Sequence, residues 1–197
     1  MGPVASSGAR WEWRTFGERF PEMDVPLLSG PHDVRSSVET YIVSADPAVN
    51  VKIRADQLEV KTLQRVDGEL EQWFPVLKAP FPLQAADIAR LFPYWHLSPP
   101  PLTRPTYTPS EFLAEVVAPV MALRTVPVTK ERHGGHLHGC IAELARLSVD
   151  GRSVETVAVE SEDCDKVRHA VRALGLSAHP NVSYVSALRR LADAHRG

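Results

Sequence analysis

The chain has 197 residues, 44% apolar and 23% charged, which is ordinary for a globular protein with one sizeable core. Its net charge of −2 excludes a global basic field, so any anion site must be local and we expect no nucleic-acid partner. Its two cysteines fit a reducing compartment, which predicts a cytoplasmic protein, and the lack of a run of about 18 apolar residues predicts no membrane span.

Alternating patterns in the first part of the chain predict a series of short strands. Residues 10–16 alternate charged and aromatic side chains, which is typical of a strand. A loop is expected over 21–33, which holds three prolines. Four strand-like runs follow, with turn dipeptides such as Asp67-Gly68 between them, at Val38–Ser44, Asn50–Arg54, Leu58–Arg65 and Glu69–Leu77.

A proline-rich segment at about 78–124 interrupts these strands and predicts a helical insertion. Leu83–Phe92 is expected to form a short helix, and residues 99–109 an extended connector. Thr108 and Glu111 have the spacing of a capping box, which predicts a second helix that runs to about Leu123 and is kinked or shortened by Pro119.

Two further strands are expected at Val126–Arg132 and His136–Val149, joined by a turn at Gly134-Gly135. Asp150-Gly151 predicts a hairpin into a third strand at Ser153–Glu160.

The last segment is expected to be helical. One helix is predicted from Asp163 to Leu174, ended by Gly175, and Asn181 is expected to cap another from Val182 to about His195. The order of strands, helical insertion, strands and helices predicts an α+β fold. About eight antiparallel strands could then close into a barrel with flanking helices.

Charged residues recur two positions apart in the predicted strands, where residues i and i+2 share a face. On the solvent face of an open sheet, such doublets would be ordinary surface residues. Like charges packed together raise the free energy unless water or a ligand screens them, so the set also fits a polar lumen for a polyanion. The doublets are Glu12 and Arg14, Lys52 and Arg54, Glu59 and Lys61, Lys130 and Arg132, and Glu160 and Glu162.

These residues resemble, over about 10–192, the CYTH superfamily, also called the triphosphate tunnel metalloenzymes. Residues 51–54 (Val-Lys-Ile-Arg), 130–132 (Lys-Glu-Arg) and 160–162 (Glu-Ser-Glu) are similar to its Leu-Arg-x-Arg, Lys-x-Arg and Glu-x-Glu strands. Its N-terminal Glu-x-Glu-x-Lys strand is matched only in part, because Arg10 stands in place of a glutamate and Arg14 in place of the lysine.

The resemblance implies one tunnel domain over 1–197, an antiparallel eight-stranded closed barrel that hydrolyses a triphosphate or related phosphate anhydride with Mg²⁺ or Mn²⁺. It further implies phosphate binding by Arg14, Lys52, Arg54, Lys61, Lys130 and Arg132, metal binding by Glu12, Glu160 and Glu162, and catalytic roles for Lys61 and Glu143. A non-catalytic module that binds polyphosphate or a nucleotide stays open as the alternative, because Arg10 removes one expected metal ligand. The oligomeric state is not predicted.

A second constellation consists of His133, His136, His138 and Cys140. The last three would share one face of a strand and could hold Zn²⁺. Their spacing matches no standard zinc motif, so a polar hairpin tip is the alternative.

Overall fold

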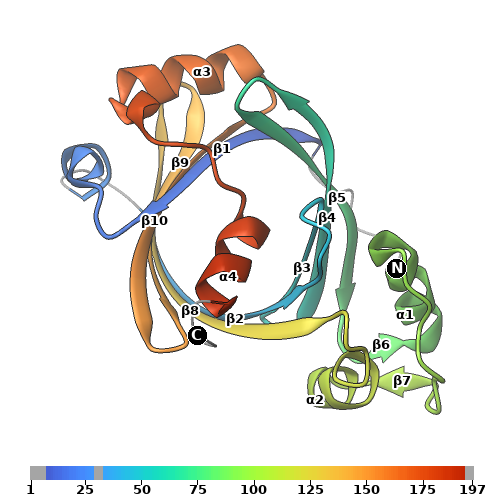
Figure 1. Cartoon of the computed structure of the whole chain (residues 1–197). Helices are drawn as coiled ribbons and strands as arrows, with labels where there is room; N and C mark the ends of the chain where they lie inside the picture. The colour runs from blue at the N-terminus through green and yellow to red at the C-terminus, as the bar shows by residue number, and fades with distance from the viewer. Residues whose placement is uncertain (1–7, 29–32, 194–197) are drawn as a thin grey trace.

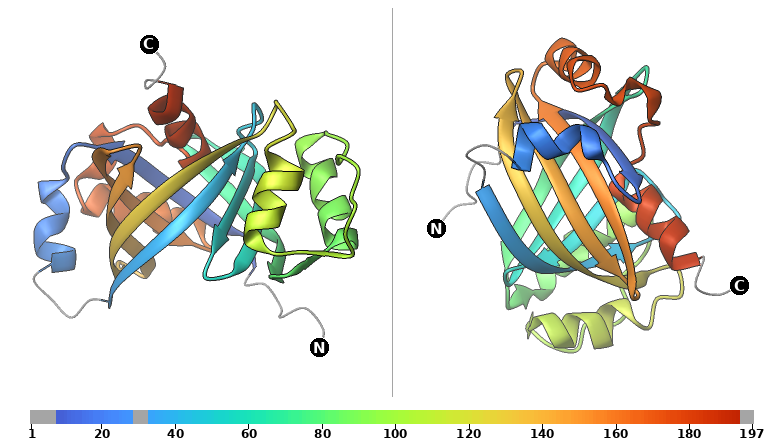
Figure 2. Two further views of the ribbon diagram at one scale, coloured as in Figure 1. Left: turned by 90° about the horizontal axis from the view of Figure 1, so that it is seen from below. Right: turned by 90° about the vertical axis from the view of Figure 1, so that its left-hand side faces the viewer.

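The computed structural model describes residues 8–28 and 33–193. Eight antiparallel strands close into a barrel in the order β1-β10-β9-β8-β2-β3-β4-β5 (Figures 1 and 2). The predicted α+β fold, with a closed eight-stranded barrel and flanking helices, is therefore confirmed. The strands are β1 (Arg10–Gly17), β2 (Asp33–Val43), β3 (Val49–Arg54), β4 (Gln57–Asp67), β5 (Leu70–Pro80), β8 (Arg124–Leu137), β9 (Cys140–Val149) and β10 (Arg152–Ser161).

The barrel places apolar side chains on its outer face and charged ones inside, because neighbouring residues of a strand point to opposite faces. On β3, Val49, Val51 and Ile53 pack outward in a buried cluster, whereas Lys52 and Arg54 line the interior. Closure pairs all strands with neighbours, so the barrel leaves no long open edge.

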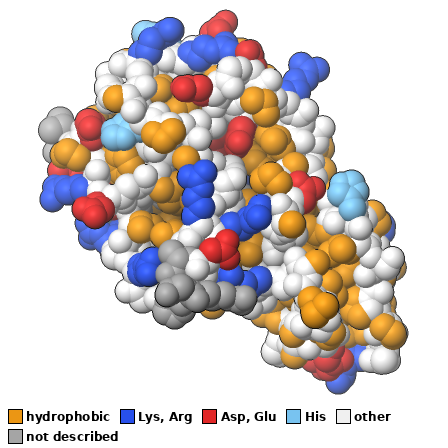
Figure 3. All heavy atoms as spheres, viewed as in Figure 1, with side chains coloured by type: hydrophobic (Ala, Val, Ile, Leu, Met, Phe, Trp, Pro, Cys, Tyr) orange, Lys and Arg blue, Asp and Glu red, His pale blue; other side chains and the backbone are white. Residues whose placement is uncertain are grey.

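Helices cover the outer apolar faces. Helix α3 (Cys164–Ala173) packs over β1, β9 and β10, where Trp11 and Trp13 are buried beneath it. The insertion between β5 and β8 packs on the outer faces of β3 and β4 and forms a separate lobe beside the barrel (Figure 1). Hydrophobic side chains remain visible on this lobe, whereas charges of both signs are interspersed over the barrel (Figure 3).

Helix α4 (Tyr184–Asp193) closes one end of the barrel, as Figures 1 and 2 show. Its apolar face packs against inward-pointing residues of the strands, including Val126, Val128 and Leu147. The lumen is thus apolar at the α4 end and charged beyond it.

The predicted turn at Gly134-Gly135 is wrong. Strand β8 continues through both glycines to Leu137, and the turn lies at His138-Gly139, where φ is +51° and +74°. A Cβ atom on Gly134 would lie 2.8 Å from an Arg132 guanidinium nitrogen, and one on Gly135 would lie 3.1 Å from Leu27. The glycines therefore make room for these side chains.

The predicted loop over 21–33 is partly helical. The 3-10 helix η1 (Pro21–Met23) and the π-helix η2 (Asp24–Leu28) form because Phe20, Met23 and Leu27 bury apolar side chains against the barrel. Residues 29–32 lie outside the described part of the chain.

The insertion also differs in detail from the prediction. Its first helix, α1 (Ala85–Leu91), continues as the 3-10 helix η3 (Phe92–Trp95). Its second begins at the predicted capping box but ends before Pro119, which has no N–H to continue the helix. That helix consists of α2 (Pro109–Glu111) and η4 (Phe112–Val117), and the short strands β6 (Leu83–Gln84) and β7 (Thr106–Tyr107) pair beside it.

Asn181 does not cap the last helix. Its side chain instead accepts a hydrogen bond from the backbone N–H of Arg14 (2.6 Å) and donates one to the carbonyl of Glu69 (2.6 Å). Ser183 serves as the cap, since its hydroxyl accepts from the Ser186 N–H at 3.3 Å. The predicted end near His195 lies outside the described residues.

Candidate ligand site in the barrel lumen

The barrel encloses a cavity of about 290 Å³ lined mainly by charged side chains. Seven of its lining residues are cationic, namely Arg10, Arg14, Lys52, Arg54, Lys61, Lys130 and Arg132. Four are acidic, namely Glu12, Glu59, Glu143 and Glu160. With the buried Glu39 just beside the cavity, the ionised groups leave an excess of two positive charges. The structure thus brings together all of the predicted site residues except Glu162.

Arg14 is the centre of one group of ion pairs. Its Nε donates to Glu12 Oε1 at 2.7 Å, its Nη1 lies 3.4 Å from Glu143 and its Nη2 lies 3.8 Å from Glu160. Burial alone would lower the pKa of Arg14, but Glu12 and Glu143 raise it well above its ordinary value. Arg14 is therefore a fixed positive charge, and only 5% of its surface is exposed.

Glu143 holds two further cations in this group. Lys130 Nζ lies 2.7 Å from one carboxylate oxygen and Arg132 Nε lies 2.9 Å from the other. Burial opposes ionisation of Glu143, but Lys130 and Arg14 outweigh it and lower its pKa to about 2. Glu143 is thus ionised at neutral pH, which makes it a weak general base.

A second group of ion pairs surrounds Glu39 and Glu59. Glu39 lies 3.1 Å from Lys52 and 3.7 Å from Arg54 and accepts a hydrogen bond from Tyr41 at 2.8 Å. Glu59 contacts the same two cations, with Arg54 Nη2 at 2.9 Å. Burial raises the pKa of Glu39, but Lys52 and Lys130 outweigh it and hold the pKa below its ordinary value.

Lys61 differs from the other lumen lysines. It lines the cavity, yet within residues 8–28 and 33–193 no carboxylate lies within 4 Å of its ammonium group. Lys61 therefore presents a positive charge to the cavity that no side chain in that part of the chain neutralises at close range.

Glu12 and Glu160 stand directly opposite each other on β1 and β10. Burial and the charge of Glu12 raise the pKa of Glu160, whereas Arg14 and Lys61 lower that of Glu12 despite its burial. Glu162 is exposed, beyond the end of β10, because the chain turns there into α3. The two-residue period that placed it beside Glu160 ends with the strand.

This donor set does not fit a divalent ion as it stands. Mg²⁺ needs accessible carboxylate oxygens, usually one or two side chains together with substrate phosphates. Here Glu12 is bonded to Arg14, and Glu160 faces Arg14 at 3.8 Å and Arg10 at 3.9 Å. Elsewhere in the described ranges, three side chains with the ligand types of a metal site converge only at Asp163, Cys164 and Asp165, outside the lumen.

The histidine constellation is divided by the turn at His138-Gly139. His136 lies on β8 and Cys140 on β9, so the three residues do not line one strand face. Cys140 is buried, and the ring of His138 packs edge-on against His169 at 5.7 Å. No metal-ligand group including these residues is found in the described structure.

Sequence reasoning missed Glu39, Tyr41 and Tyr184 as lumen residues. Glu39 belongs to no charged doublet, since its inward neighbours on β2 are Ser37 and Tyr41. The period of two along Ser37, Glu39 and Tyr41 was the available signal. Tyr184 comes from α4, and only the closed fold brings it to the cavity.

The barrel is shared with proteins of known structure. It matches a candidate adenylyl cyclase from Hippeastrum, for which a dominant triphosphatase activity is described, at a TM-score of 0.52 and 9% identity, covering 92% of this chain and 95% of that one. It also matches a candidate adenylate cyclase from Bacillus halodurans at a TM-score of 0.50 and 12% identity, covering 91% and 97%. These matches confirm the fold that the resemblance to the CYTH superfamily implied, and at 9% and 12% identity they show the fold alone.

Comparison of sequences alone finds less. No family model matches the chain, and no curated protein sequence matches it significantly. None of the helices in the described ranges has the length and apolarity needed to cross a membrane.

Proposed function

We propose that this protein binds a small anion with several phosphate groups, such as a triphosphate, in the barrel lumen. The observation that carries the proposal is the convergence of seven arginines and lysines on one enclosed cavity of about 290 Å³. Several cations are needed around a polyphosphate, because one cannot neutralise it. The two excess positive charges of the lumen favour such a ligand over a neutral one.

The ligand would exchange partners with the carboxylates already present. Lys61 offers its charge directly, and Arg54, 39% exposed at its side chain, can turn from Glu59 to a phosphate oxygen. Lys130 is more firmly held, because it is 9% exposed at its side chain and bonded to Glu143. We infer that Glu143 positions Lys130 and Arg132 for phosphate rather than taking part in proton transfer.

Hydrolysis of the bound phosphate anhydride with Mg²⁺ or Mn²⁺ is the second candidate function. The opposed carboxylates of Glu12 and Glu160 favour it, as does the triphosphatase activity described for the Hippeastrum protein. It would require both glutamates to exchange their arginine contacts for the ion. That the protein is a CYTH-type hydrolase and uses a divalent metal stays a prediction. Its cytoplasmic location, which the unpaired thiols of Cys140 and Cys164 suggest, stays one as well.

One sample can separate the two candidates. Tripolyphosphate is titrated into the protein by calorimetry, and phosphate release is measured with Mg²⁺, with Mn²⁺ and with neither. Heat of binding without release supports the binding function. Phosphate release that depends on metal and is lost in Glu160→Gln supports hydrolysis. The absence of both binding heat and phosphate release would contradict both candidate functions.

A further inference from the structure

Arg14 is held on every side by the protein itself. Each guanidinium nitrogen faces a carboxylate, with Nε at 2.7 Å from Glu12, Nη1 at 3.4 Å from Glu143 and Nη2 at 3.8 Å from Glu160. Its guanidinium carbon lies 4.8 Å from the ring centroid of Tyr184. Arg14 thus has little freedom to turn toward a ligand, unlike a phosphate-binding residue at the surface of the cavity.

The backbone of Arg14 is fixed as well. Its N–H donates to Asn181 Oδ1 at 2.6 Å, and its carbonyl accepts from the N–H of Val182 at 2.6 Å. The guanidinium therefore stays between the two opposed carboxylates of Glu12 and Glu160. Two ionised carboxylates that face each other in a buried site repel, and this repulsion is relieved by a proton on one of them or by a cation beside them. Arg14 supplies such a cation to Glu12 and Glu160.

Arg10 adds a second cation to the same acidic pair. It precedes Glu12 by two residues on β1, lines the same cavity, and places Nη1 3.9 Å from Glu160 Oε2. Its side chain is 33% exposed, so it lies nearer to solvent than Arg14. Both carboxylates thus have an arginine counter-ion within the chain.

We propose that Arg14, assisted by Arg10, takes the place of a divalent ion at the Glu12–Glu160 pair, so that the lumen binds its polyanion without metal. This inference rests on the proposed binding function and states which cations serve it. A guanidinium built into the chain is present at any metal concentration, whereas Mg²⁺ must be recruited from solution. Arg14 is here a positioning residue, and Lys61 and Arg54 are among those that meet the ligand.

The first test measures tripolyphosphate binding by calorimetry in EDTA and in excess Mg²⁺. We expect tripolyphosphate to bind at least as tightly in EDTA as in Mg²⁺, because the free ligand chelates Mg²⁺ and the ion cannot improve the site. Binding that requires Mg²⁺ or Mn²⁺ would overturn the inference while leaving the proposed function intact. Absence of binding under both conditions would remove the proposed function itself.

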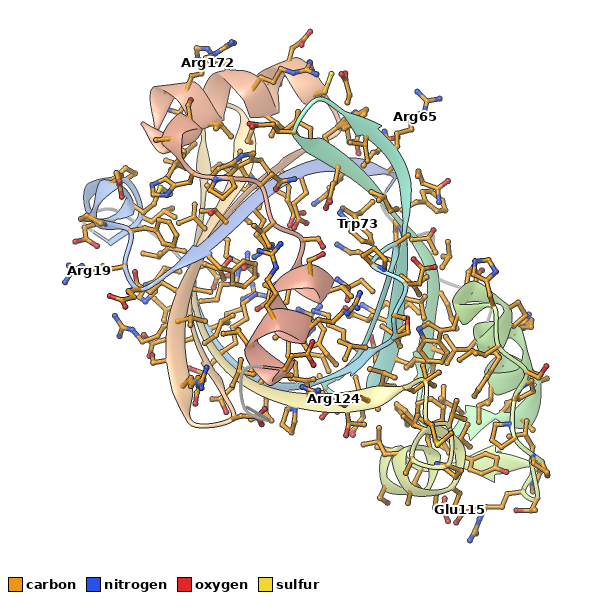
Figure 4. All side chains as sticks on the ribbon, viewed as in Figure 1. Arg19, Arg65, Trp73, Glu115, Arg124 and Arg172 are labelled. Carbon is orange, nitrogen blue, oxygen red and sulfur yellow. The ribbon has the colours of Figure 1, made fainter. Side chains whose placement is uncertain are left out.

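The second test needs no polyanion and examines the acidic pair directly. It measures Mn²⁺ binding to the protein through the electron paramagnetic resonance signal of the ion. We expect no stoichiometric Mn²⁺ binding by the wild-type protein. Arg10→Glu would bring a third carboxylate to Glu12 and Glu160. This variant is expected to bind Mn²⁺ at least tenfold more tightly than the wild-type protein. Arg65→Glu makes the same charge change on the outside of β4, where Figure 4 shows Arg65 pointing away from the barrel, and is expected to gain none.

Arg14→Gln provides a further variant for the same measurement. It should also gain Mn²⁺ binding if it folds, because it leaves Glu12, Glu143 and Glu160 without their shared counter-ion. Arg10→Glu leaves Arg14 in place and therefore tests the acidic pair even if Arg14→Gln does not fold. Stoichiometric Mn²⁺ binding by the wild-type protein, or equal affinities in Arg10→Glu and Arg65→Glu, would contradict the proposal.

Discussion

Tyr41 of β2 and Tyr184 of α4 stack face to face, with ring centroids 4.9 Å apart and planes inclined by 6°. Cations lie over both rings, with Lys52 5.8 Å from the Tyr41 centroid, and Arg14 and Lys130 at 4.8 Å and 5.6 Å from that of Tyr184. The two rings therefore join the Glu39 group of ion pairs to the Arg14 group. They also attach α4 to the barrel wall.

Tyr184→Ala is expected to lower the free energy of unfolding by about 3 kcal/mol, since it removes a buried aromatic ring and leaves a cavity. Tyr184→Phe keeps the ring and should stay within about 1 kcal/mol of the wild type. Urea denaturation measures both, and equal losses in the two variants would show that the ring is not the stabilising group.

Lys61 and Lys130 are expected to separate binding from stability. Lys61→Met should weaken tripolyphosphate binding at least tenfold. It should change the free energy of unfolding by less than about 1 kcal/mol, because no close ion pair is broken. Lys130→Met should lower stability by about 3 kcal/mol, because it breaks a buried pair with Glu143. Calorimetry and urea denaturation of the two variants check this, and the reverse order of effects would contradict the site as described.

Stability is expected to fall in acid partly through Glu143. Its pKa is lowered from 4.5 to about 2 in the folded protein, so its stabilisation is present above pH 4.5 and is lost as pH falls toward 2. The difference corresponds to about 3 kcal/mol. Glu143→Gln should be less stable at neutral pH and lose less between pH 5 and 2, as measured by urea denaturation at each pH; parallel curves would refute this assignment.

Lys52→Ala and Arg132→Ala are each expected to weaken polyanion binding at least tenfold, because both charges face the same cavity. Arg65→Ala is the matched control, since it removes a cation from the exterior of the barrel. Titration of tripolyphosphate at constant ionic strength measures the effect. If the three variants bind alike, the ligand does not enter the lumen.

Asn181→Ala is expected to lower stability by about 2 kcal/mol, because it leaves the N–H of Arg14 and the carbonyl of Glu69 without their partner. Ser177→Ala, at an exposed position of the same connecting segment, should change it by less than about 0.5 kcal/mol. Urea denaturation distinguishes them, and a neutral Asn181→Ala would show that another group or water takes over these bonds.

The barrel could be predicted because its strands obey a local rule. The period of two along Lys52 and Arg54 fixes a shared face, and Asp150-Gly151 forms the predicted turn. The turn predicted at Asp67-Gly68 lies one residue later, at Gly68-Glu69, because Asp67 still pairs with Leu70. Gly134-Gly135 misled because a glycine pair is typical both of a turn and of close approach by other side chains. Only the positions of Arg132 and Leu27 distinguish the two.

The charges of the site could be predicted, but their pairing could not. Lys52 and Lys61 look alike in the sequence, each two residues from another charge. In the barrel, Lys52 meets Glu39 from β2, which no doublet marks, whereas Lys61 meets no carboxylate at close range in the described chain. Contacts across strands depend on register and closure, which a single strand's pattern does not contain.

The pairing of β1 with β5 and β10, which closes the barrel, bears on the order in which the molecule folds. Strand β1 pairs with β5 only over Arg10–Glu12, and Asn181 bonds the backbone of Arg14 from 167 residues away. On the ribosome, β2–β5 and then β8–β10 can pair with neighbours as they emerge, whereas β1 must wait for β10 and Asn181. A nascent chain that stops before residue 181 would therefore carry all eight strands and the lumen charges, but it would lack both the Asn181 bond to β1 and helix α4, which closes one end of the barrel.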